Sequence, residues 1–262
     1  IKNGNLKELK REKLIAVESI SEDEIGREEE IKYRYCTEAY LEDLKIEISE
    51  LRERVSDLGD SLIIAGDKNK LRLHIHTSKP AELFNRLNKL AVILDQKADD
   101  MQLQQAVKYD KKSEIAILAD SIADLPEQFS KKHQIHLLPL NILYEGSNYL
   151  DKVTINSSNF FDLVDEAEEY PSSAQPSVKK IEDKLSYLSE HYNKIIAITV
   201  SAKMSGTYDN LNKAAENILK ENSDLEIEVI DSKTNSGAEG LLVMEAAEQI
   251  AEDKSFGEIV DY

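Results

Sequence analysis

The 262-residue sequence predicts a mixed α/β protein of two domains, an α+β domain followed by a domain built on a parallel sheet. Two observations lead to this prediction. Between residues 28 and 101, strand-like and helix-like segments follow a split β-α-β order, whereas the second half contains apolar strand-like runs separated mainly by helical segments. A chain of this length can also bury two separate hydrophobic cores.

The first domain is predicted to begin near Glu28 and to have the element order β-α-β-β-α-β. Gly59 is placed to end the first helix, and Pro80 is placed to begin the second. The expected elements are a strand starting near Tyr33, a helix over 46–58, strands over 60–67 and 70–77, a helix over 80–91 and a strand over 91–101. This order is that of a ferredoxin-like domain, which we place at 28–105, after an acidic lead-in or linker at 1–27.

The second domain follows a polar joint and is expected to span 114–262, with 106–113 as the linker. Its strand-like runs are apolar without alternation, which is typical of strands buried on both faces of a parallel sheet. They lie at 114–120, 134–144, 194–200 and 225–231. The second half is therefore predicted to be α/β.

Charge and composition restrict the function. With 51 acidic and 33 basic side chains, the formal net charge is -18, which disfavours binding to nucleic acid or to anionic lipid surfaces. The single cysteine forms no internal disulfide, and no apolar run approaches the ~20 residues of a membrane span. These features fit a cytoplasmic protein. The chain starts "IKNGNLKELKREK", without Met, and we expect it to be part of a longer polypeptide.

Small polar residues follow the expected strands of the second domain, where ligands gather in open parallel sheets. A single serine at such a turn is usually a helix N-cap. Several converging turns favour a site for a carboxylate or a phosphate, since hydroxyls and helix N-terminal N–H groups donate to anions. The turns contain Asp120 and Ser121; Ser172, Ser173, Gln175 and Ser177; Ser201, Ser205, Gly206 and Thr207; Asp231, Ser232, Thr234 and Ser236. No Walker loop, GxGxxG run or GxSxG elbow accompanies them.

The segments "ILADSIADLP", "YPSSAQPS", "SAKMSGTYDNLNKAA" and "VIDSKTNSGAEGLLV" resemble the ordered motifs of the DegV family of bacterial fatty-acid-binding proteins. The resemblance covers 114–262, and family members continue beyond that length. It implies the first lobe of a two-lobed fold with an acyl tunnel between the lobes. It also implies that hydroxyls hold the acyl carboxylate, with Ser173 in place of a motif Thr and Ser205 as the motif Ser. Ala174 departs from the family pattern.

The site that this resemblance implies contains Ser173, Gln175, Ser205, Gly206 and Thr207, with Asp120 and Ser121 as support. Its expected ligand is a long-chain fatty acid, and later an acyl phosphate. Basic and histidine residues that family members use come from the second lobe, which this chain does not contain.

A second candidate site lies in the first domain, where His74 and His76 are two residues apart and so share one face of a strand. With Cys36 on another strand of the same sheet, they would form a three-ligand zinc site with an open fourth position. Spacing alone leaves alternatives open. His-x-His pairs occur on solvated strands without metal, and a lone cysteine is most often a buried apolar residue.

The segments "YRYCTEAYLE", "LRERVSDLGDSLIIAGDKNKLRLHIHTSKP" and "ILDQKADDMQLQ" resemble the middle domain of bacterial fatty acid kinase. The resemblance runs from Arg34 to Gln105. It implies a metal, which we expect to be zinc, bound by Cys36, His74 and His76 beside the kinase active site. The nucleotide-binding domain of that kinase would precede residue 1.

Together, the two resemblances imply the central part of a fatty acid kinase/DegV fusion. We expect a lipid-binding and kinase-coupling module that is not itself an enzyme, with the kinase-like nucleotide domain of the same polypeptide as its partner. Two alternatives stay open. One is a hydrolase or transferase that uses Ser205 as nucleophile and a histidine from the missing lobe. The other is a metal-dependent dimerisation domain, which would make the parent protein a homodimer.

Overall fold

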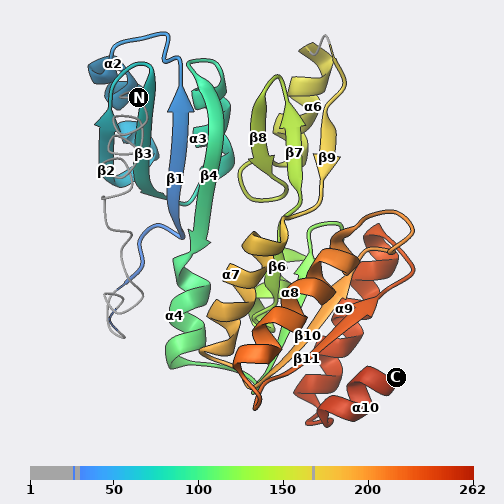
Figure 1. Cartoon of the computed structure of the whole chain (residues 1–262). Helices are drawn as coiled ribbons and strands as arrows, with labels where there is room; N and C mark the ends of the chain where they lie inside the picture. The colour runs from blue at the N-terminus through green and yellow to red at the C-terminus, as the bar shows by residue number, and fades with distance from the viewer. Residues whose placement is uncertain (1–25, 27–29, 167–168) are drawn as a thin grey trace, which may run out of the picture. The chain divides into compact units, whose positions relative to one another are not determined.

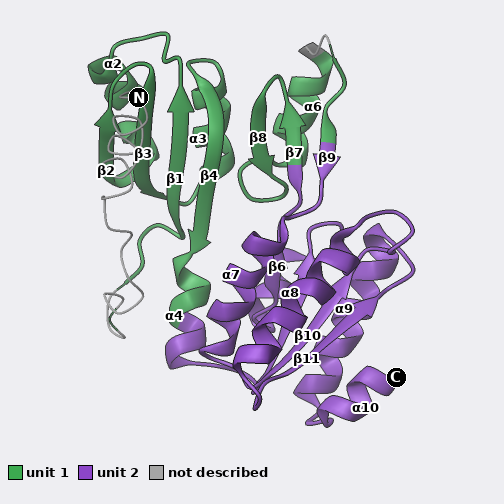
Figure 2. Cartoon of the chain, viewed as in Figure 1, with its two compact units in different colours: residues 1–105, 142–172 green, residues 106–141, 173–262 purple. Residues whose placement is uncertain are grey.

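The computed structural model describes residues 26, 30–166 and 169–262. These residues form two compact units (Figure 2). One contains the described residues up to 105 and those between 142 and 172, and the other contains 106–141 and 173–262. Apart from residue 26, the acidic lead-in predicted for 1–27 lies outside the described residues. None of the helices in the described part of the chain combines the length and the apolarity that a membrane span requires.

The first unit contains the predicted β-α-β-β-α-β order (Figure 1). The four strands form an antiparallel sheet in the order β2-β3-β1-β4, which is the ferredoxin-like arrangement. The elements are β1 (Tyr35–Glu42), α2 (Ile48–Val55), β2 (Gly59–Gly66), β3 (Lys70–Thr77), α3 (Pro80–Asn88) and β4 (Val92–Asp100), with a short 3-10 helix, η2 (Ser56–Leu58), before β2.

The two faces of this sheet differ in chemistry, because successive residues of a strand point to opposite sides. Leu73 and Ile75 of β3 are fully buried in a core shared with Leu83 and Phe84 of α3. Burying each such side chain contributes about 1.5–3 kcal/mol. The residues that alternate with them on β3 are Arg72, His74 and His76, so the opposite face carries polar and titratable groups.

A small sheet in the order β8-β7-β9 and one helix follow in the chain. The helix, β8 and most of β7 belong to the first unit, whereas β9 spans the boundary, with Ser173 and Ala174 in the second unit. The strands are β7 (Asn141–Tyr144), β8 (Ser147–Leu150) and β9 (Ser172–Ala174), and the helix is α6 (Ser157–Glu166). Glu145 and Gly146 connect β7 and β8 with φ values of 46° and 76°, which is the conformation of a two-residue type I′ hairpin. The apolar run predicted as one strand over 134–144 forms two strands, β6 (His136–Leu138) and β7. Pro139 lies between them and has no N–H to donate to a strand ladder.

Part of the predicted polar joint is helical. Helix α4 (Met101–Tyr109) begins directly after β4, and the Asp100 carboxylate accepts a hydrogen bond of 3.0 Å from the Leu103 N–H, as an N-cap residue does. Val107, one turn after Leu103, is buried. The N-cap at Asp100 and the burial of Val107 stabilise a helix in a segment whose polar composition alone predicts a loop.

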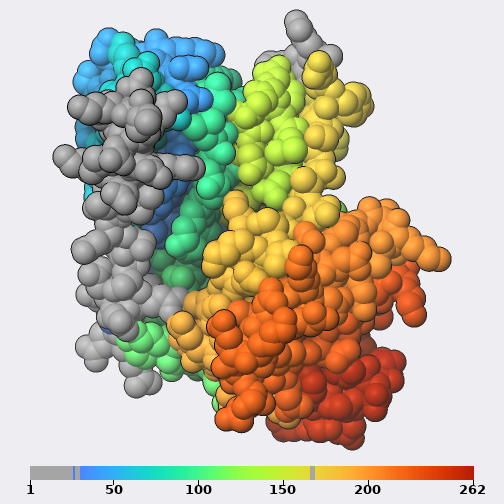
Figure 3. Space-filling model, in the orientation of Figure 1, coloured from blue at the N-terminus to red at the C-terminus, as the bar shows by residue number. Residues whose placement is uncertain are grey.

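The second unit has a parallel sheet in the order β11-β10-β5-β6, as the apolar runs predict. Helices α9 and α10 pack on one another and on one face of this sheet through Val243, Ala246 and Ile259, and are drawn in red in Figure 3. The strands are β5 (Ile115–Asp120), β6 (His136–Leu138), β10 (Lys194–Thr199) and β11 (Glu226–Asp231); the helices are α5 (Glu127–Lys132), α7 (Val178–Ser189), α8 (Thr207–Glu221), α9 (Ser236–Ala251) and α10 (Phe256–Asp261).

Candidate functional site

The first candidate site lies in the second unit, at the carboxyl ends of β5, β10 and β11. Because these strands are parallel neighbours, the loops that follow them leave the same edge of the sheet. The three strands end at Asp120, Thr199 and Asp231, and each loop begins at the next residue. The polar turns that the sequence singled out after these three strands are therefore gathered at one edge.

Asp120 and Ser121 hold the backbone of this edge together. The buried Asp120 carboxylate accepts hydrogen bonds from the N–H groups of Val200 (2.8 Å) and Ile122 (2.9 Å). The buried Ser121 hydroxyl accepts one from the Leu140 N–H (3.0 Å). Both side chains are thus engaged with backbone, and the Asp120 contact joins the end of β5 to the loop after β10.

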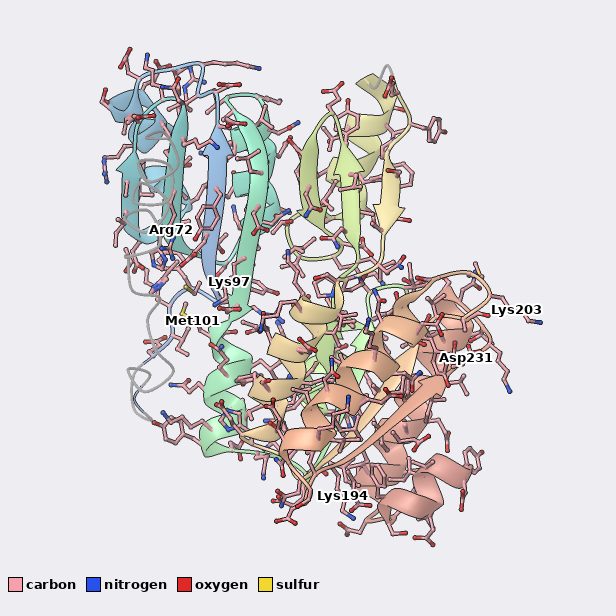
Figure 4. The ribbon with its side chains drawn as sticks, viewed as in Figure 1. Arg72, Lys97, Met101, Lys194, Lys203 and Asp231 are labelled. Atoms are coloured by element: carbon pink, nitrogen blue, oxygen red, sulfur yellow. The ribbon has the colours of Figure 1, made fainter. Side chains whose placement is uncertain are left out.

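Asp231 ties together the loops after β10 and β11. Its Oδ1 accepts hydrogen bonds from Ala202 N–H at 3.0 Å and from Lys233 N–H at 2.9 Å, and Ser201 N–H donates to the Thr234 carbonyl at 2.9 Å. The side chain of Lys203, next to this anchor, points outward from the domain (Figure 4). Sequence reasoning noted Asp231 only as part of a turn, whereas its position at the end of a strand marks it as a loop anchor.

The Ser-Gly-Thr motif forms the start of α8. Gly206 is the N-cap residue, and it has no side chain with which to accept from the N–H groups of the first turn. The hydroxyls of Ser205 and Thr207 share a hydrogen bond of 2.9 Å, and the Thr207 N–H also donates to the Ser205 hydroxyl at 3.3 Å. Ser205 is half-buried and Thr207 is fully buried, so Ser205 offers the accessible hydroxyl of the pair.

Gln175 links the second motif to the third. A Cβ atom added to Gly206 would lie 2.6 Å from Gln175 Nε2, so the Gln175 amide rests directly against the glycine. The Asn210 amide, one turn into α8, donates to the Pro176 carbonyl at 2.9 Å. Sequence reasoning missed Asn210, because a helical asparagine carries no motif of its own.

The remaining motif serines have different surroundings. Ser173 lies on β9, exposed, two residues before Gln175. Ser177 is the N-cap of α7, and its hydroxyl accepts from the Lys180 N–H at 3.3 Å. Ser177 therefore has the capping role that a serine at a helix start usually has, whereas Ser173 precedes no helix.

The second candidate site lies on the polar face of the ferredoxin-like sheet. Cys36 of β1 is directly opposite His76 of β3, and Glu38 is opposite His74. One ligand atom from each of Cys36, His74 and His76 lies within 4.8 Å of the others, and Cys36 Sγ is 3.9 Å from His74 Nδ1. The structure thus brings the three predicted ligands together on one face.

Charged groups surround these three side chains. Glu38 Oε1 is 2.5 Å from Arg72 Nη2 and 3.7 Å from His74 Nδ1, and both Glu38 and Arg72 are buried. Arg72 of β3 and Lys97 of β4, on the two strands that flank β1, are labelled in Figure 4. Burial raises the pKa of the Cys36 thiol to about 12, with Asp99 and Glu38 adding to the effect. Burial, and then His74, lower the pKa of His76.

The donor set fits a borderline-soft metal such as zinc. His76 Nε2 is buried and has no hydrogen-bond partner among the described residues, as expected of a nitrogen whose lone pair is reserved for a ligand. Without a cation, the thiol is neutral at physiological pH, and a bound divalent ion would favour the thiolate. Cys36, His74 and His76 would hold the ion, which would supply a Lewis-acidic centre with one further coordination position.

Comparison with known families gives two matches along the chain. The model of the DegV family, described as an uncharacterised protein family, matches residues 114–262. The model of the fatty acid kinase-like middle domain matches residues 32–108. A DegV domain-containing protein of Clostridium acetobutylicum is 38% identical over 147 residues, covering 56% of this chain and 50% of the relative. The chain spans about half the length of the curated relatives it matches.

Solved structures agree with the DegV match. A fatty acid (stearic acid)-binding protein from Eubacterium ventriosum is 27% identical with a TM-score of 0.52, covering 56% of this chain and 51% of that one. A DegV lipid-binding protein from Thermotoga maritima is 30% identical with a TM-score of 0.51, covering 56% and 51%. With more than half of its length matched by the family model, the chain belongs to the DegV family, and its DegV part is preceded by a fatty acid kinase-like middle domain.

Proposed function

We propose that the second unit binds a long-chain fatty acid by its carboxylate, with the hydroxyls of Ser173 and Ser205 as the principal donors. The observation that carries this proposal is the contact between Gln175 and Gly206, which joins the segment that follows Ser173 and β9 to the loop containing Ser205. The similar solved proteins from Eubacterium ventriosum and Thermotoga maritima, described as stearic acid-binding and lipid-binding, support the choice of ligand.

The start of α8 suits a carboxylate for two physical reasons. The N–H groups of a first helical turn carry partial positive charge, and Gly206 at the N-cap supplies no side chain that would neutralise them. The half-buried Ser205 hydroxyl stands immediately before them. A carboxylate there would accept from the hydroxyl and from the helix N-terminus together, and an acyl phosphate would use the same donors.

Fatty-acid titration of serine variants tests this site. We expect Ser173→Ala and Ser205→Ala each to lower affinity for stearate by one to two decades, because a hydrogen bond to a charged group contributes about 1.5–3 kcal/mol. Ser177→Ala is the matched control, since its hydroxyl caps α7, and it is expected to lower the melting temperature while leaving affinity unchanged. If all three variants bind stearate as the wild type does, the head-group assignment is wrong.

We further propose that Cys36, His74 and His76 bind zinc in the first unit. The clustering of their ligand atoms and the buried, unpartnered His76 Nε2 support this site. Metal analysis by native mass spectrometry should report one zinc ion per chain for the wild type and none for Cys36→Ser. A wild-type chain that remains metal-free after exposure to stoichiometric zinc would contradict the assignment.

The parent polypeptide is proposed to couple this carrier to a fatty acid kinase. The middle-domain match supports this, since it lies directly before the DegV match in one chain. Covalent linkage would present the bound fatty acid to the kinase domain at an effective concentration in the millimolar range for a short linker. Fatty-acid-dependent ATP turnover should fall strongly when the carrier is supplied as a separate chain at micromolar concentration.

The alternative of a Ser205 nucleophile has little support from the site. In the described residues the Ser205 hydroxyl is bonded to the hydroxyl and the amide of Thr207, and neither group is a general base. Labelling by a serine-directed acyl phosphonate that is lost in Ser205→Ala would revive this alternative. If the metal site holds a dimer together, removing the metal with a chelator should convert the dimer to a monomer.

A further inference from the structure

Asp60 lies at the edge of the candidate metal site, on the opposite side of His76 from Cys36. It is the second residue of β2 and pairs directly with His76 across the β2–β3 ladder. Its Oδ1 is 3.7 Å from His76 Nδ1, and its side chain is half exposed. The sequence motifs and the strand spacing do not distinguish this aspartate from its neighbours.

The local backbone places Asp60 beside the histidine. A Cβ atom on Gly59 would lie 1.9 Å from the His76 carbonyl oxygen, so only glycine permits this close approach of β2 to β3. After Asp60 the ladder is irregular: Asp60 pairs with His76 and Ile63 with His74, so three steps on β2 match two on β3. Ser61, with a φ of 56°, lies in this bulge. Bulges commonly redirect a side chain next to a functional site.

The two nitrogens of His76 have different surroundings. Nδ1 faces the Asp60 carboxylate, whereas Nε2 is buried without a hydrogen-bond partner in the described part of the chain. A neutral imidazole carries its proton on one nitrogen only, and a carboxylate beside one nitrogen favours the proton there. Metal-binding histidines usually donate their other N–H to such a group, which orients the ring and raises its basicity.

We propose that Asp60 is a positioning residue for the metal site: it accepts the Nδ1 proton of His76 in a hydrogen bond and so directs the Nε2 lone pair toward the ion held by Cys36 and His74. Asp60 is not a ligand in this arrangement. The inference rests on the proposed zinc site and adds to it the tautomer of His76 and the group that fixes it.

Zinc affinity of the whole chain, measured by competition with a chelator of known affinity, tests the proposal. Asp60→Asn should weaken zinc binding by about 10- to 100-fold, the usual cost of losing an outer carboxylate. The matched control is Asp57→Asn, which removes the same charge from an exposed residue of the same unit that pairs with Arg86. Its zinc affinity should change less than about fivefold, as for a solvent-screened ion pair. Asp60→Glu, which retains the carboxylate, should recover part of the loss.

Two spectroscopic measurements separate positioning from ligation. With cobalt in place of zinc, the thiolate charge-transfer band should persist in Asp60→Asn and disappear in Cys36→Ser. In the metal-free wild type, nitrogen NMR should show His76 protonated on Nδ1, and Asp60→Asn should give a mixture of tautomers.

The outcomes distinguish this inference from the zinc site itself. If the wild type binds neither zinc nor cobalt, the site and the role of Asp60 are both wrong. If the wild type binds zinc and Asp60→Asn binds it equally well, only the role of Asp60 is overturned. Equal losses in Asp60→Asn and Asp57→Asn would also overturn it, since they would indicate a general effect of charge.

Discussion

The two candidate sites are built in different ways. On the ferredoxin-like sheet, functional side chains stand directly on paired strands, and the ladder that places Cys36 opposite His76 also fixes their separation. In the parallel-sheet unit, most of the candidate groups lie on loops or at helix starts, and the loops after β5, β10 and β11 are fastened by Asp120 and Asp231. A strand-built site therefore depends on the stability of its sheet, whereas a loop-built site depends on side chains that hold the loop backbone, as Asp120 and Asp231 do here.

This difference predicts where stability and binding separate. Changes on the strand-built face should affect folding, because the charged groups there are buried among one another. Changes to Ser173, Gln175 and Ser205 at the loop-built edge should affect ligand affinity more than folding, because these side chains are half-buried or exposed. The four experiments below test this contrast, beginning with the largest expected effect.

The largest effect is expected for Arg72→Met. Arg72 and Glu38 are 5% and 4% exposed, and their side chains are 2.5 Å apart, so the substitution leaves a buried carboxylate without its cation. Removing one partner of a buried pair costs about 3–5 kcal/mol, which urea unfolding should detect. The double variant Arg72→Met, Glu38→Leu should recover most of this loss. A single variant as stable as the wild type would show that the polar face tolerates an unpaired charge.

The second effect is a pH dependence of the second unit, where His136 of β6 is fully buried beside the Tyr192 hydroxyl at 3.3 Å. Burial lowers the pKa of His136 well below its ordinary value, with Lys184 and His191 adding to the shift. The unfolded chain then takes up a proton near pH 6.5 that the folded chain does not. Stability is therefore complete above that pH and falls as the pH drops, by about 2 kcal/mol at pH 5.

Comparing the unfolding of the wild type and of His136→Leu between pH 8 and pH 5 isolates the contribution of His136 to the free energy of unfolding. The other titrating groups are present in both chains, so their effects cancel. The wild type should lose more stability on acidification than the variant does. If the free energy of unfolding changed with pH in the same way for both chains, His136 would not be a neutral buried group in the folded protein. The core of the second unit would then not account for any loss of stability in acid.

Much of the fold was predictable because it depends on periodicity. Alternation along β3 placed Leu73 and Ile75 in the core, and the same alternation placed His74 and His76 on the other face. Pro139 was visible in the sequence, but its consequence was missed: the run 134–144 divides, and residues 142–172 group with the first unit. That grouping depends on long-range packing of Tyr144, Tyr149 and Ile155 in the first core, which no local pattern encodes.

The candidate sites were predictable in part. Ser173, Ser205 and the three metal-ligand candidates carry motifs or spacings that a sequence shows. The groups that hold them do not, because the Asp60 contact arises from a bulge and the Asp231 contacts from two loops distant in sequence. Supporting residues of this kind are specified by backbone geometry, so they become apparent only in three dimensions.

The third effect concerns Gly206. Alanine is sterically compatible with its backbone, at φ -79° and ψ 10°, but its methyl group would displace the Gln175 amide. We expect Gly206→Ala to weaken stearate binding about tenfold, or ~1.4 kcal/mol, with at most about 1 kcal/mol of lost stability. Gly237→Ala is the control, since a Cβ there meets no atom within 4 Å. A clearly lower melting temperature with unchanged stearate affinity would contradict the description of this edge as loop-built.

The smallest effect is expected for Asn210→Ala, which removes the hydrogen bond from α8 to the Pro176 carbonyl. One such bond contributes about 0.5–1.5 kcal/mol to stability. Because it fastens the segment that follows Ser173, its loss should also weaken stearate binding by a few-fold, although Asn210 itself is not proposed to touch the ligand. Asn212→Ala is a close control: it changes the same residue type on the same helix, and its amide donates within α8 to the Tyr208 carbonyl at 3.0 Å. Thermal melts and stearate titrations of the two variants separate the possibilities. If Asn212→Ala weakens binding as much as Asn210→Ala does, the loss reflects the stability of α8, and the anchor between helix and loop has no part in holding the fatty acid.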